Sequence, residues 1–500
     1  MLRAVSNRRS AAAEGPIAVV DVGSNSIRLV VYERLSRAPS VIHNEKITCA
    51  LGRRLARTGR LDPVGVACAL ANLPRFLALC RGLDVARVEM FATAAVREAA
   101  DGPDFAAEVE KRLGQELRVL SGEEEARLSA LGVIAGNPGA DGLMGDLGGG
   151  SLELVALERG KPGAAATLPL GPLQLIEVSG NDAAEAARVI KREFAPPDWL
   201  GATKNKTFFA VGGAWRALAK FHMTRANYPV PVIHNYELEA GEARELAMAA
   251  SRLDPEGKVP GVARARLRML PFAALLLKRV IAAAEPARVV FSAFGLREGQ
   301  LYDLLPEAER RQDPLIAACR ELARRESALG IDGEALFAWT QPLFAGESEE
   351  ERRLRLAACL LGDIARLDHP DVRASQAFAR ALFIPAVGID HRSRMFLALA
   401  LFARYKGDIQ SPVTRAVREL VGGSERERAV LLGRALRLGH TVAGGAPVLL
   451  ARTRLALSRT TLALRLLSGA EHLEGEVVAK MLAPLAEIVG RRPEIVHGAG

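Results

Sequence analysis

Aspartate, glycine and serine recur at matching positions in two stretches of the sequence. The first stretch, DVGSNSIRLVVYER, runs from Asp21 to Arg34, and the second, DLGGGSLELVALER, runs from Asp146 to Arg159. Seven of the 14 aligned positions are identical. Each stretch follows an apolar run and continues into alternating apolar residues, a pattern that predicts a strand, a tight loop and a second strand. The chain is therefore predicted to contain two related hairpins.

The two predicted loops carry residue types that bind phosphate. Glycines, serines and an asparagine leave the backbone N–H groups open to a ligand, and hydroxyl groups add further donors. The carboxylates that open the stretches, Asp21 and Asp146, could hold a divalent cation directly or through water. One such loop alone could be an ordinary hairpin turn, but two facing loops would clamp a polyanion together with its metal ion. The candidate phosphate-binding residues are Gly23, Ser24, Asn25 and Ser26 in the first loop and Gly148, Gly149, Gly150 and Ser151 in the second.

Two further candidate residues follow predicted strands. Arg97 comes just after a buried strand, where ligands bind in α/β sheets, and its guanidinium fork suits phosphate oxygens. Glu124 lies in the first turn of a helix that begins at Ser121. It could return a capping hydrogen bond to Ser121, or it could take a proton from an attacking water. Glu123 and Glu125 compete with it for the second role.

Strand and helix patterns alternate over about the first 300 residues, whereas the rest of the chain shows mainly helical periodicity. This change predicts an α/β part followed by an all-α part, separated by a polar segment between two prolines. A helix over residues 295–305 closes the α/β part and either completes its second domain or returns to the first. The predicted division is a flexible N-terminus (1–14), two domains (15–136 and 137–304), a linker (305–314) and an all-helical region (315–500).

Composition argues against several classes of protein. Hydrophobic residues make up 49% and charged residues 25% of the 500 residues, as in globular proteins. The five cysteines are odd in number and include no CxxC pair, which argues against a disulfide framework or a zinc site and for a reducing compartment. The N-terminus lacks the apolar core of a signal peptide, and no run reaches the roughly 18 apolar residues of a membrane span. We therefore expect a cytoplasmic protein without a membrane partner.

Positive charge is concentrated near the C-terminus. The net charge is +9, and residues 391–470 hold 14 Lys and Arg against 4 Asp and Glu. This basic stripe could attract a long polyanion, or it could be an arginine-rich solvated surface. Aromatic residues are sparse, which makes nucleic acid an unlikely partner. The candidate polymer-binding residues are Arg415, Arg418, Arg426 and Arg428.

Five motifs in this order resemble those of the exopolyphosphatase and guanosine pentaphosphate phosphohydrolase (Ppx/GppA) family, which belongs to the actin and sugar kinase superfamily. The resemblance covers about the first 300 residues. The motifs are DVGSNSIRLVV (21–31), TAAVREA (93–99), SGEEEARL (121–128), DLGGGSLEL (146–154) and GLREG (295–299).

The resemblance implies a fold and a set of site residues. It implies two ribonuclease-H-like domains related by duplication, with the active site in the cleft between them. Asp21, Asp146 and Glu153 become candidates for a Mg²⁺ and phosphate site, and Arg97 a phosphate ligand. The glutamate that activates water in the family is assigned to Glu124. The helical C-terminal region resembles HD-type phosphohydrolases, but its metal site is degenerate, and the protein is expected to be a homodimer.

The activity implied by the resemblance is exopolyphosphatase, which releases terminal orthophosphate from inorganic polyphosphate by metal-assisted attack of water. Hydrolysis of guanosine pentaphosphate by the same residues is the nearest alternative. A kinase of the superfamily is a further enzymatic alternative. A sensor that binds polyphosphate or a nucleotide without turnover belongs to a different class.

Overall fold

The computed structural model describes residues 15–254, 264–326 and 332–498. The predicted flexible N-terminus, residues 1–14, lies outside the described residues. The chain divides into two compact units, Met1–Gln312 and Asp313–Gly500. This division falls inside the predicted linker, which also contains the short helix α13 (Glu307–Arg310).

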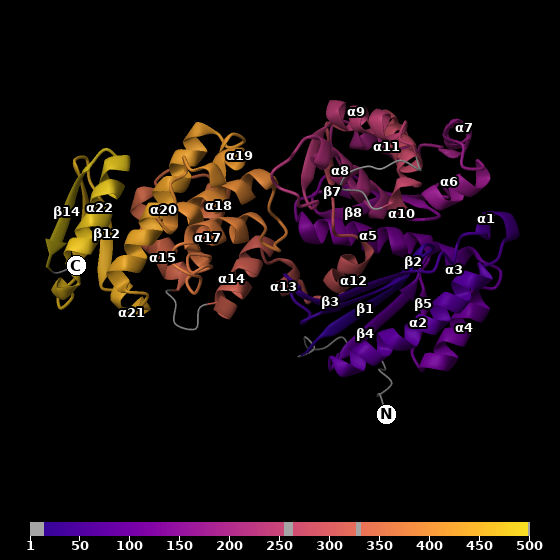
Figure 1. Cartoon of the computed structure of the whole chain (residues 1–500), viewed down its shortest axis with the longest axis horizontal. Coiled ribbons are helices and arrows are strands. Elements are labelled where there is room, and N and C mark those ends of the chain that lie inside the picture. The colour runs from indigo at the N-terminus through magenta and orange to yellow at the C-terminus, as the bar shows by residue number, and fades with distance from the viewer. Residues whose placement is uncertain (1–14, 255–263, 327–331, 499–500) are drawn as a thin grey trace. The chain divides into compact units, whose positions relative to one another are not determined.

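Two mixed sheets with equivalent topology form the framework of the first unit (Figure 1). Their strand orders are β3-β2-β1-β4-β5 and, read from the matching edge, β8-β7-β6-β9-β11-β10. In each sheet the opening hairpin is antiparallel, and the next strand of the sheet pairs in parallel with the first strand of that hairpin. The first sheet contains β1 (Ile17–Val22), β2 (Ser26–Tyr32), β3 (Val41–Thr48), β4 (Arg87–Ala92) and β5 (Arg118–Val119). The second contains β6 (Gly142–Leu147), β7 (Leu152–Glu158), β8 (Lys161–Leu168), β9 (Thr207–Val211), β10 (Tyr236–Glu239) and β11 (Arg288–Phe291).

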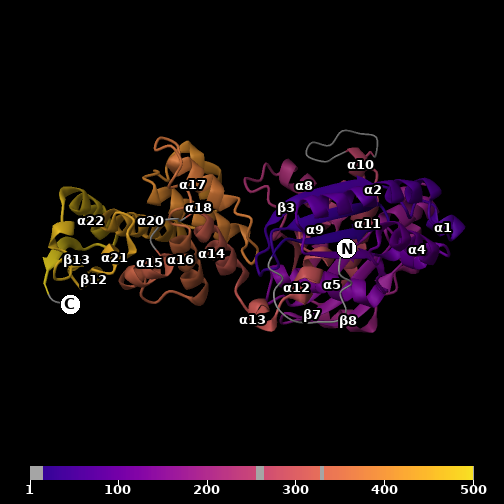
Figure 2. The same ribbon diagram turned by 90° about the horizontal axis from the view of Figure 1, so that it is seen from below.

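Helices α5 (Gly122–Gly136) and α12 (Leu296–Leu304) lie side by side and contact both sheets (Figure 1, Figure 2). On α5, Ala130 packs with the core of the second sheet, while Leu128 packs with Leu301 of α12 on the first. The two helices approach closely because α12 has a glycine at 299, where a Cβ would overlap the Leu128 carbonyl. The closing helix thus lies between the two sheets, with Leu301 packed on the first sheet and Tyr302 against the cores of both.

The other faces of the sheets are covered by separate groups of helices (Figure 1). Helices α2 (Pro63–Gly82) and α4 (Gly102–Leu113) pack on the first sheet. The second sheet is covered by α6 (Pro172–Val178), α7 (Ala183–Glu193), α8 (Gly213–Arg225), α9 (Ala240–Ala250) and α11 (Leu270–Ala284). Short helices α1 (Leu55–Thr58), α3 (Ala94–Glu98) and α10 (Arg264–Leu267) complete the unit.

Helix α2 is apolar enough and long enough to cross a membrane, judged by length and composition alone. The sequence-based expectation that no segment has this property is therefore wrong for α2. In the structure, Leu73 and Phe76 of this helix pack with strand residues of the first sheet. Asp62 caps its first turn by accepting hydrogen bonds from the N–H groups of Val64 and Gly65. These contacts are those of a helix in a domain core, and a single such helix is weak evidence for a membrane span.

The second unit is mainly helical. Its central helix, α18 (His391–Arg404), packs against α16 (Glu349–Leu360), α17 (Arg373–Leu382) and α20 (Gly423–Ala443). Further helices are α14 (Pro314–Glu326), α15 (Gly333–Thr340), α19 (Arg415–Arg418), α21 (Pro447–Leu450) and α22 (Glu476–Ile488).

The prediction that this region is entirely helical is wrong near the C-terminus. A sheet of order β12-β13-β14 is built from β12 (Thr453–Leu457), β13 (Thr461–Leu466) and β14 (Arg492–His497). Short leucine- and arginine-rich runs are compatible with either structure, because five or six residues contain too few repeats to distinguish a period of 2 from one of 3.6. Here β13 pairs in parallel with β14, which follows it only after helix α22, and a local pattern cannot show such a partner.

Candidate active site

The two predicted phosphate loops have the same backbone structure. In the first loop, the N–H of Gly23 donates to the carbonyl of Ser26 at 3.0 Å. In the second, the N–H of Gly148 donates to the carbonyl of Ser151, also at 3.0 Å. Each bond closes the turn between the two strands of a hairpin. The repeat in the sequence is therefore a repeat in three dimensions.

The first loop is held by the chain segment that follows β3. The N–H of Gly52 donates to the Ser24 carbonyl at 2.9 Å, and the N–H of Ala50 donates to the Asn25 carbonyl at 3.0 Å. The carbonyls of Ser24 and Asn25 therefore both accept hydrogen bonds from neighbouring backbone, which fixes the position of the loop. The loop is thus supported from the side of helix α1.

The second loop is held in the equivalent way by the start of α6. The N–H of Leu173 donates to the Gly149 carbonyl at 3.0 Å, and the N–H of Gly171 donates to the Gly150 carbonyl at 2.9 Å. A Cβ at position 171 would overlap the Gly149 backbone, so this approach requires glycine. Both loops therefore offer N–H groups rather than carbonyls. In the part of the chain that the structure describes, five N–H groups of the loops donate no hydrogen bond: those of Ser24, Asn25, Gly149, Gly150 and Ser151.

The loops face one another, as the clamp requires. A Cβ at Gly149 would lie 3.2 Å from the Cβ of Ser24, and one at Gly150 would lie 3.6 Å from the Ser24 Oγ. A cavity of about 160 Å³ is lined by both loops together with Glu98 and Gln174. Backbone donors from two loops that meet at one cavity can hold adjacent anionic groups of a single ligand.

Carboxylates from both hairpins lie beside the loops; Glu153 is buried, and Asp21 and Asp146 are half-buried. Burial raises the pKa of Asp21 and of Asp146, and it raises that of Glu153 well above its usual value. The Ser129 hydroxyl on α5 donates to Asp146 at 2.6 Å. Glu153 is 1% exposed, and its Oε1 has no hydrogen-bond partner in the described structure. Buried acids with raised pKa values favour a cation or a proton at this site.

The prediction that Glu124 faces the loops is not supported, and Glu125 takes its place. The side chain of Glu124 is 35% exposed and lies 3.7 Å from the Arg118 guanidinium. The Glu125 side chain is buried, and burial raises its pKa to about 7, with Asp146 and Asp21 contributing. Adjacent helix positions differ by about 100° in direction, which is why a shift of one residue moves the carboxylate from the surface to the site.

The capping alternative for Glu124 is half right. Ser121 Oγ accepts a hydrogen bond from the Glu124 backbone N–H at 3.1 Å, so Ser121 caps α5. No reciprocal bond from the Glu124 carboxylate to Ser121 is recorded among the described residues. Glu124 therefore marks the helix start through its backbone, while its side chain pairs with Arg118.

The side chain of Arg97 connects the Glu125 carboxylate to the backbone at the end of the first sheet. It lies on α3, directly after β4, as the sequence predicted. Its Nη1 donates to Glu125 Oε2 at 2.7 Å and to the Leu120 carbonyl at 3.0 Å. Its Nη2 lies 3.5 Å from Glu98. Arg97 thus orients Glu125 and remains 20% exposed, which leaves part of its guanidinium accessible to a ligand.

Five basic residues that sequence reasoning missed converge on the same site. Burial, with the nearby charges of Arg266 and Arg28, lowers the pKa of Lys46 to about 8. Burial and then Arg297 lower the pKa of Arg216 to about 10. Arg297 Nε lies 3.8 Å from Asp21 Oδ2. A polyanion would relieve the repulsion among these cations.

Sequence signals for some of these cations existed. Arg28 pairs with Asp21 across the first hairpin, and Glu153 pairs with Asp146 at the equivalent place in the second. Arg297 belongs to the GLREG motif, and Arg216 follows the glycines that open α8. Comparing the two repeats position by position would have exposed Arg28 as the counterpart of Glu153.

The carboxylates fit a divalent cation only as part of a larger shell. Among the described residues, no group of three or more Asp, Glu, His or Cys side chains is arranged to hold a metal ion. Asp21 and Asp146 occupy the same position in the two repeats, and burial raises the pKa of both side chains. Mg²⁺ is commonly held by one or two carboxylates, with waters and phosphate oxygens completing its shell. The residues present therefore fit Mg²⁺ in the company of a phosphate ligand.

Residues 10–308 match the family model described as the Ppx/GppA phosphatase family. The match spans more than half of the chain. The chain belongs to the Ppx/GppA phosphatase family. Residues 315–496 match a second model, described as the exopolyphosphatase C-terminal region.

The chain is similar to curated proteins whose names describe different roles. The chain is 25% identical to Retrograde regulation protein 2 of Saccharomyces cerevisiae over 447 residues, 80% of this chain and 74% of that protein. It is 28% identical to Exopolyphosphatase 1 of Mycobacterium tuberculosis over 297 residues, 57% of this chain and 86% of that protein. A solved exopolyphosphatase from Cytophaga hutchinsonii, 21% identical, covers 58% of this chain and 97% of its own with a TM-score of 0.52. At this identity the solved structure supports the fold alone.

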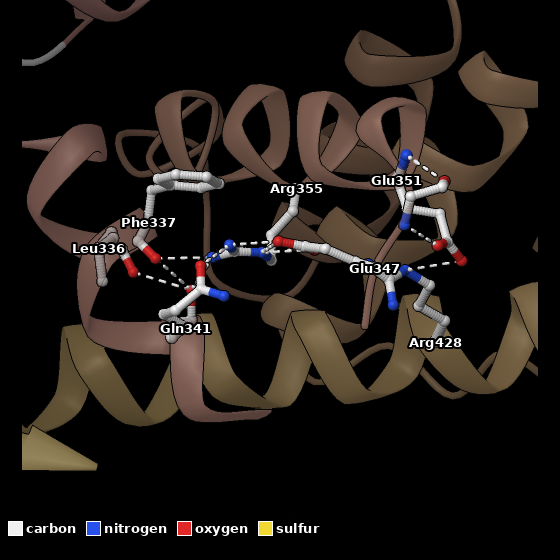
Figure 3. Close-up of polar contacts among 9 residues, drawn as sticks. Leu336, Phe337, Gln341, Glu347, Glu351, Arg355 and Arg428 are labelled. Carbon is white, nitrogen blue, oxygen red and sulfur yellow. Dashed lines mark hydrogen bonds and ion pairs between the residues drawn. The ribbon is translucent and has the colours of Figure 1, made fainter. Parts of the chain in front are cut away.

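The candidate polymer-binding arginines of this Ppx/GppA protein differ in exposure and in their partners. Arg428 is 19% exposed and donates to Glu347 at 2.8 Å, with Glu351 at 3.6 Å (Figure 3). Arg418 donates to the Ile409 carbonyl at 2.7 Å. Arg415 is 75% exposed beside Glu419, and Arg426 is partly buried. Arg428 is therefore partly buried and already paired with two carboxylates.

Glu347 connects Arg428 to a second arginine that is fully buried. Arg355 has 0% exposed side chain and donates from Nε to Glu347 at 3.0 Å (Figure 3). It also donates to the Thr340 hydroxyl at 3.0 Å and to the Phe337 carbonyl at 2.6 Å. Arg428 of the basic stripe therefore belongs to a network of ion pairs and hydrogen bonds within the second unit, a structural role that neither interpretation of the stripe included.

Proposed function

We propose that this Ppx/GppA protein is an exopolyphosphatase, which releases terminal orthophosphate from inorganic polyphosphate by attack of water. The observation that carries the proposal is the meeting of two equivalent loops, with Ser24 and Gly149 in contact, beside the buried Glu125. Five loop N–H groups that have no intramolecular partner in the described structure supply donors for phosphate oxygens.

Each group has a distinct role in the proposed reaction. The loops and Arg97 hold the terminal phosphoryl groups, while Arg28 and Arg297 offset the negative charge of the chain. Glu125 accepts the proton of the attacking water, because a pKa of about 7 leaves it ionised at slightly alkaline pH yet basic enough to take a proton. The leaving chain is a stabilised phosphate anion, so it needs no general acid.

Mg²⁺ is the proposed cofactor, held by Asp21 and Asp146 with Glu153 beside them. When bound, it supplies positive charge to the phosphoryl oxygens. The pKa values of these acids, raised by burial, mean that the site without a cation favours protons. Phosphate release should therefore be lost in a chelator and restored by Mg²⁺.

The substrate is best tested with the purified full chain. Initial rates of orthophosphate release should be compared for long-chain polyphosphate and guanosine pentaphosphate, each with and without Mg²⁺. We expect faster release from polyphosphate, because five cationic residues influence one another's charge near the carboxylates of the site and the relative from Mycobacterium tuberculosis carries the name exopolyphosphatase. Faster release from guanosine pentaphosphate would favour the alternative substrate, and release that requires a nucleoside diphosphate would favour a kinase.

A non-catalytic sensor is the second candidate. It is favoured by the likeness to Retrograde regulation protein 2, whose name describes regulation and which matches across both units of this chain. Such a protein would bind polyphosphate or a nucleotide at the same loops. Saturable binding of polyphosphate in Mg²⁺ without any orthophosphate release would support the sensor and exclude the enzyme.

We also propose that the protein is cytoplasmic and forms a homodimer. The second unit is proposed to be HD-like. In it, Asp363 lies 3.4 Å from His440 and 3.7 Å from Arg404. Size-exclusion chromatography with light scattering would decide between a monomer and a dimer.

A further inference from the structure

Two thiols of the first unit lie in direct contact. The Sγ atoms of Cys49 and Cys68 are 3.1 Å apart, and both cysteines are free. Cys49 follows β3, and Cys68 lies on α2. A disulfide has an S–S length of about 2.05 Å, so bond formation needs an approach of about 1 Å. This pair has no role in the proposed hydrolysis.

The segment that carries Cys49 also supports the first phosphate loop. The N–H of Cys49 donates to the Asn25 carbonyl at 3.2 Å, three residues before Gly52 donates to Ser24. On its other side the segment is pressed against α2, where a Cβ at Gly65 would lie 2.8 Å from the Cys49 carbonyl. Any movement of Cys49 towards Cys68 is therefore expected to move the first loop as well.

The two thiols differ in their surroundings. Cys49 is buried, and burial raises its pKa to about 12, with Cys68 as the next cause. Cys68 is partly exposed, and the Asn72 side-chain amide lies 3.8 Å from its sulfur. Oxidation begins at the accessible sulfur, because an oxidant must reach it and a thiolate must attack. Cys68 is thus the first to react, and Cys49 is the resolving thiol.

We propose that Cys49 and Cys68 are a site of reversible oxidation, at which hydrogen peroxide forms an intramolecular disulfide that displaces the first phosphate loop. In the first step the Cys68 sulfur attacks a peroxide oxygen, the O–O bond breaks, and a sulfenic acid and one water form. In the second step the Cys49 sulfur attacks the Cys68 sulfur, the S–O bond breaks, and a second water leaves. The peroxide takes two electrons and the two thiol protons end in the waters.

The consequence for activity rests on the proposed function of the loop. A displacement of about 1 Å in a group that positions substrate can lower a rate up to about 100-fold. Side-chain rotation accounts for part of the approach of the two sulfurs, so the backbone of the loop moves by less than about 1 Å. We therefore expect a loss of about tenfold in phosphate release. A thiol reductant should restore the rate, because thiol–disulfide exchange reverses the bond. A reducing compartment is the setting in which such redox-sensing disulfides occur.

The test treats the full chain with hydrogen peroxide and maps its peptides without reduction. We expect a peptide that links Cys49 to Cys68 and that is lost after reduction. Hydrogen exchange of the loop, residues 23–26, should change when the link forms, and phosphate release should fall and then recover with reductant. The Cys68→Ala variant should show none of these changes, whereas Cys80→Ala, which removes another buried thiol of the same unit, should show them all.

The outcomes separate the two proposals. Absence of the linked peptide, or the same peroxide response in Cys68→Ala, would overturn the oxidation site. A linked peptide without any change in loop exchange would overturn the coupling to the loop. If the unoxidised protein releases no phosphate, the proposed function fails, but the linked peptide and the exchange of the loop still decide the oxidation proposal.

Discussion

Replacing Glu125 by glutamine tests the assignment of the base most sharply. The substitution keeps the size of the side chain and a hydrogen-bond acceptor for Arg97, but it removes the group that takes the proton. The neighbouring Glu124→Gln is a matched control, because both residues lie in the first turn of α5 and both changes remove one negative charge. Only Glu125 is buried with the carboxylates of the site.

The magnitude follows from the pKa of the group. With a pKa of about 7, roughly one tenth of Glu125 is ionised at pH 6 and roughly nine tenths at pH 8. Because only the ionised form accepts a proton, kcat/KM of the unchanged protein should rise about tenfold between these pH values. Loss of a general base typically lowers the rate 10²- to 10⁴-fold, or about 3–5 kcal/mol of transition-state stabilisation.

The assay measures orthophosphate release from polyphosphate between pH 5.5 and 9, with polymer binding measured separately. Glu125→Gln should bind polymer, lose about 10²- to 10⁴-fold in rate and lose the rise with pH. Glu124→Gln should stay within about twofold at all pH values, since its exposed pairing with Arg118 is screened by water. Equal losses in the two variants, or a larger loss in Glu124→Gln, would refute the reasoning.

Other residues of both units give further predictions. In Arg97→Met, the pKa of Glu125 loses the cation that lowers it, so the midpoint of the kcat/KM–pH profile should move to higher pH; an unchanged midpoint would contradict this. In Gly149→Ala, the new methyl group meets the first loop, and kcat/KM should fall about tenfold, whereas Gly139→Ala, which meets no atom within 4 Å, should change nothing. Arg355→Met should lower the unfolding free energy by about 3–5 kcal/mol, measured with denaturant, and a change below about 1 kcal/mol would show that its network adds little.

The loops could be predicted because their chemistry is local and repeated. Glycine and serine at matching offsets from Asp21 and Asp146 determine the turns, and the same turn bond closes both. Duplication also made their meeting predictable, because equivalent hairpins of two related domains are brought to one site. The strand that precedes Arg97 could also be predicted, because it depends on a single apolar run.

The direction of the glutamates on α5 was harder to read from local sequence. Three consecutive acids begin the helix, and each fits a first turn. One signal was available: Glu125 and Ser129 are four residues apart and share a face, and Ser129 is fully buried where it donates to Asp146. Glu124 shares its face instead with Leu128, whose core contacts are to the other sheet.

Long-range partners account for the remaining differences. Lys46 lies on β3 of the first sheet and Arg216 on helix α8, which covers the second sheet, so they approach only in the folded chain and no spacing in the sequence connects them. Arg428 appeared to belong to a surface stripe, but Glu347, 81 residues earlier, holds it inside the second unit. The C-terminal strands depend likewise on a partner beyond α22.

Hydrolysis of polyphosphate in water enriched in oxygen-18 tests the central claim most directly. If the two loops hold the chain end and Glu125 activates water against the terminal phosphorus, each released orthophosphate carries one oxygen from the solvent and the remaining chain carries none. Label at the new end of the chain would place the attack on the wrong phosphorus. Saturable binding without released orthophosphate would contradict the account altogether.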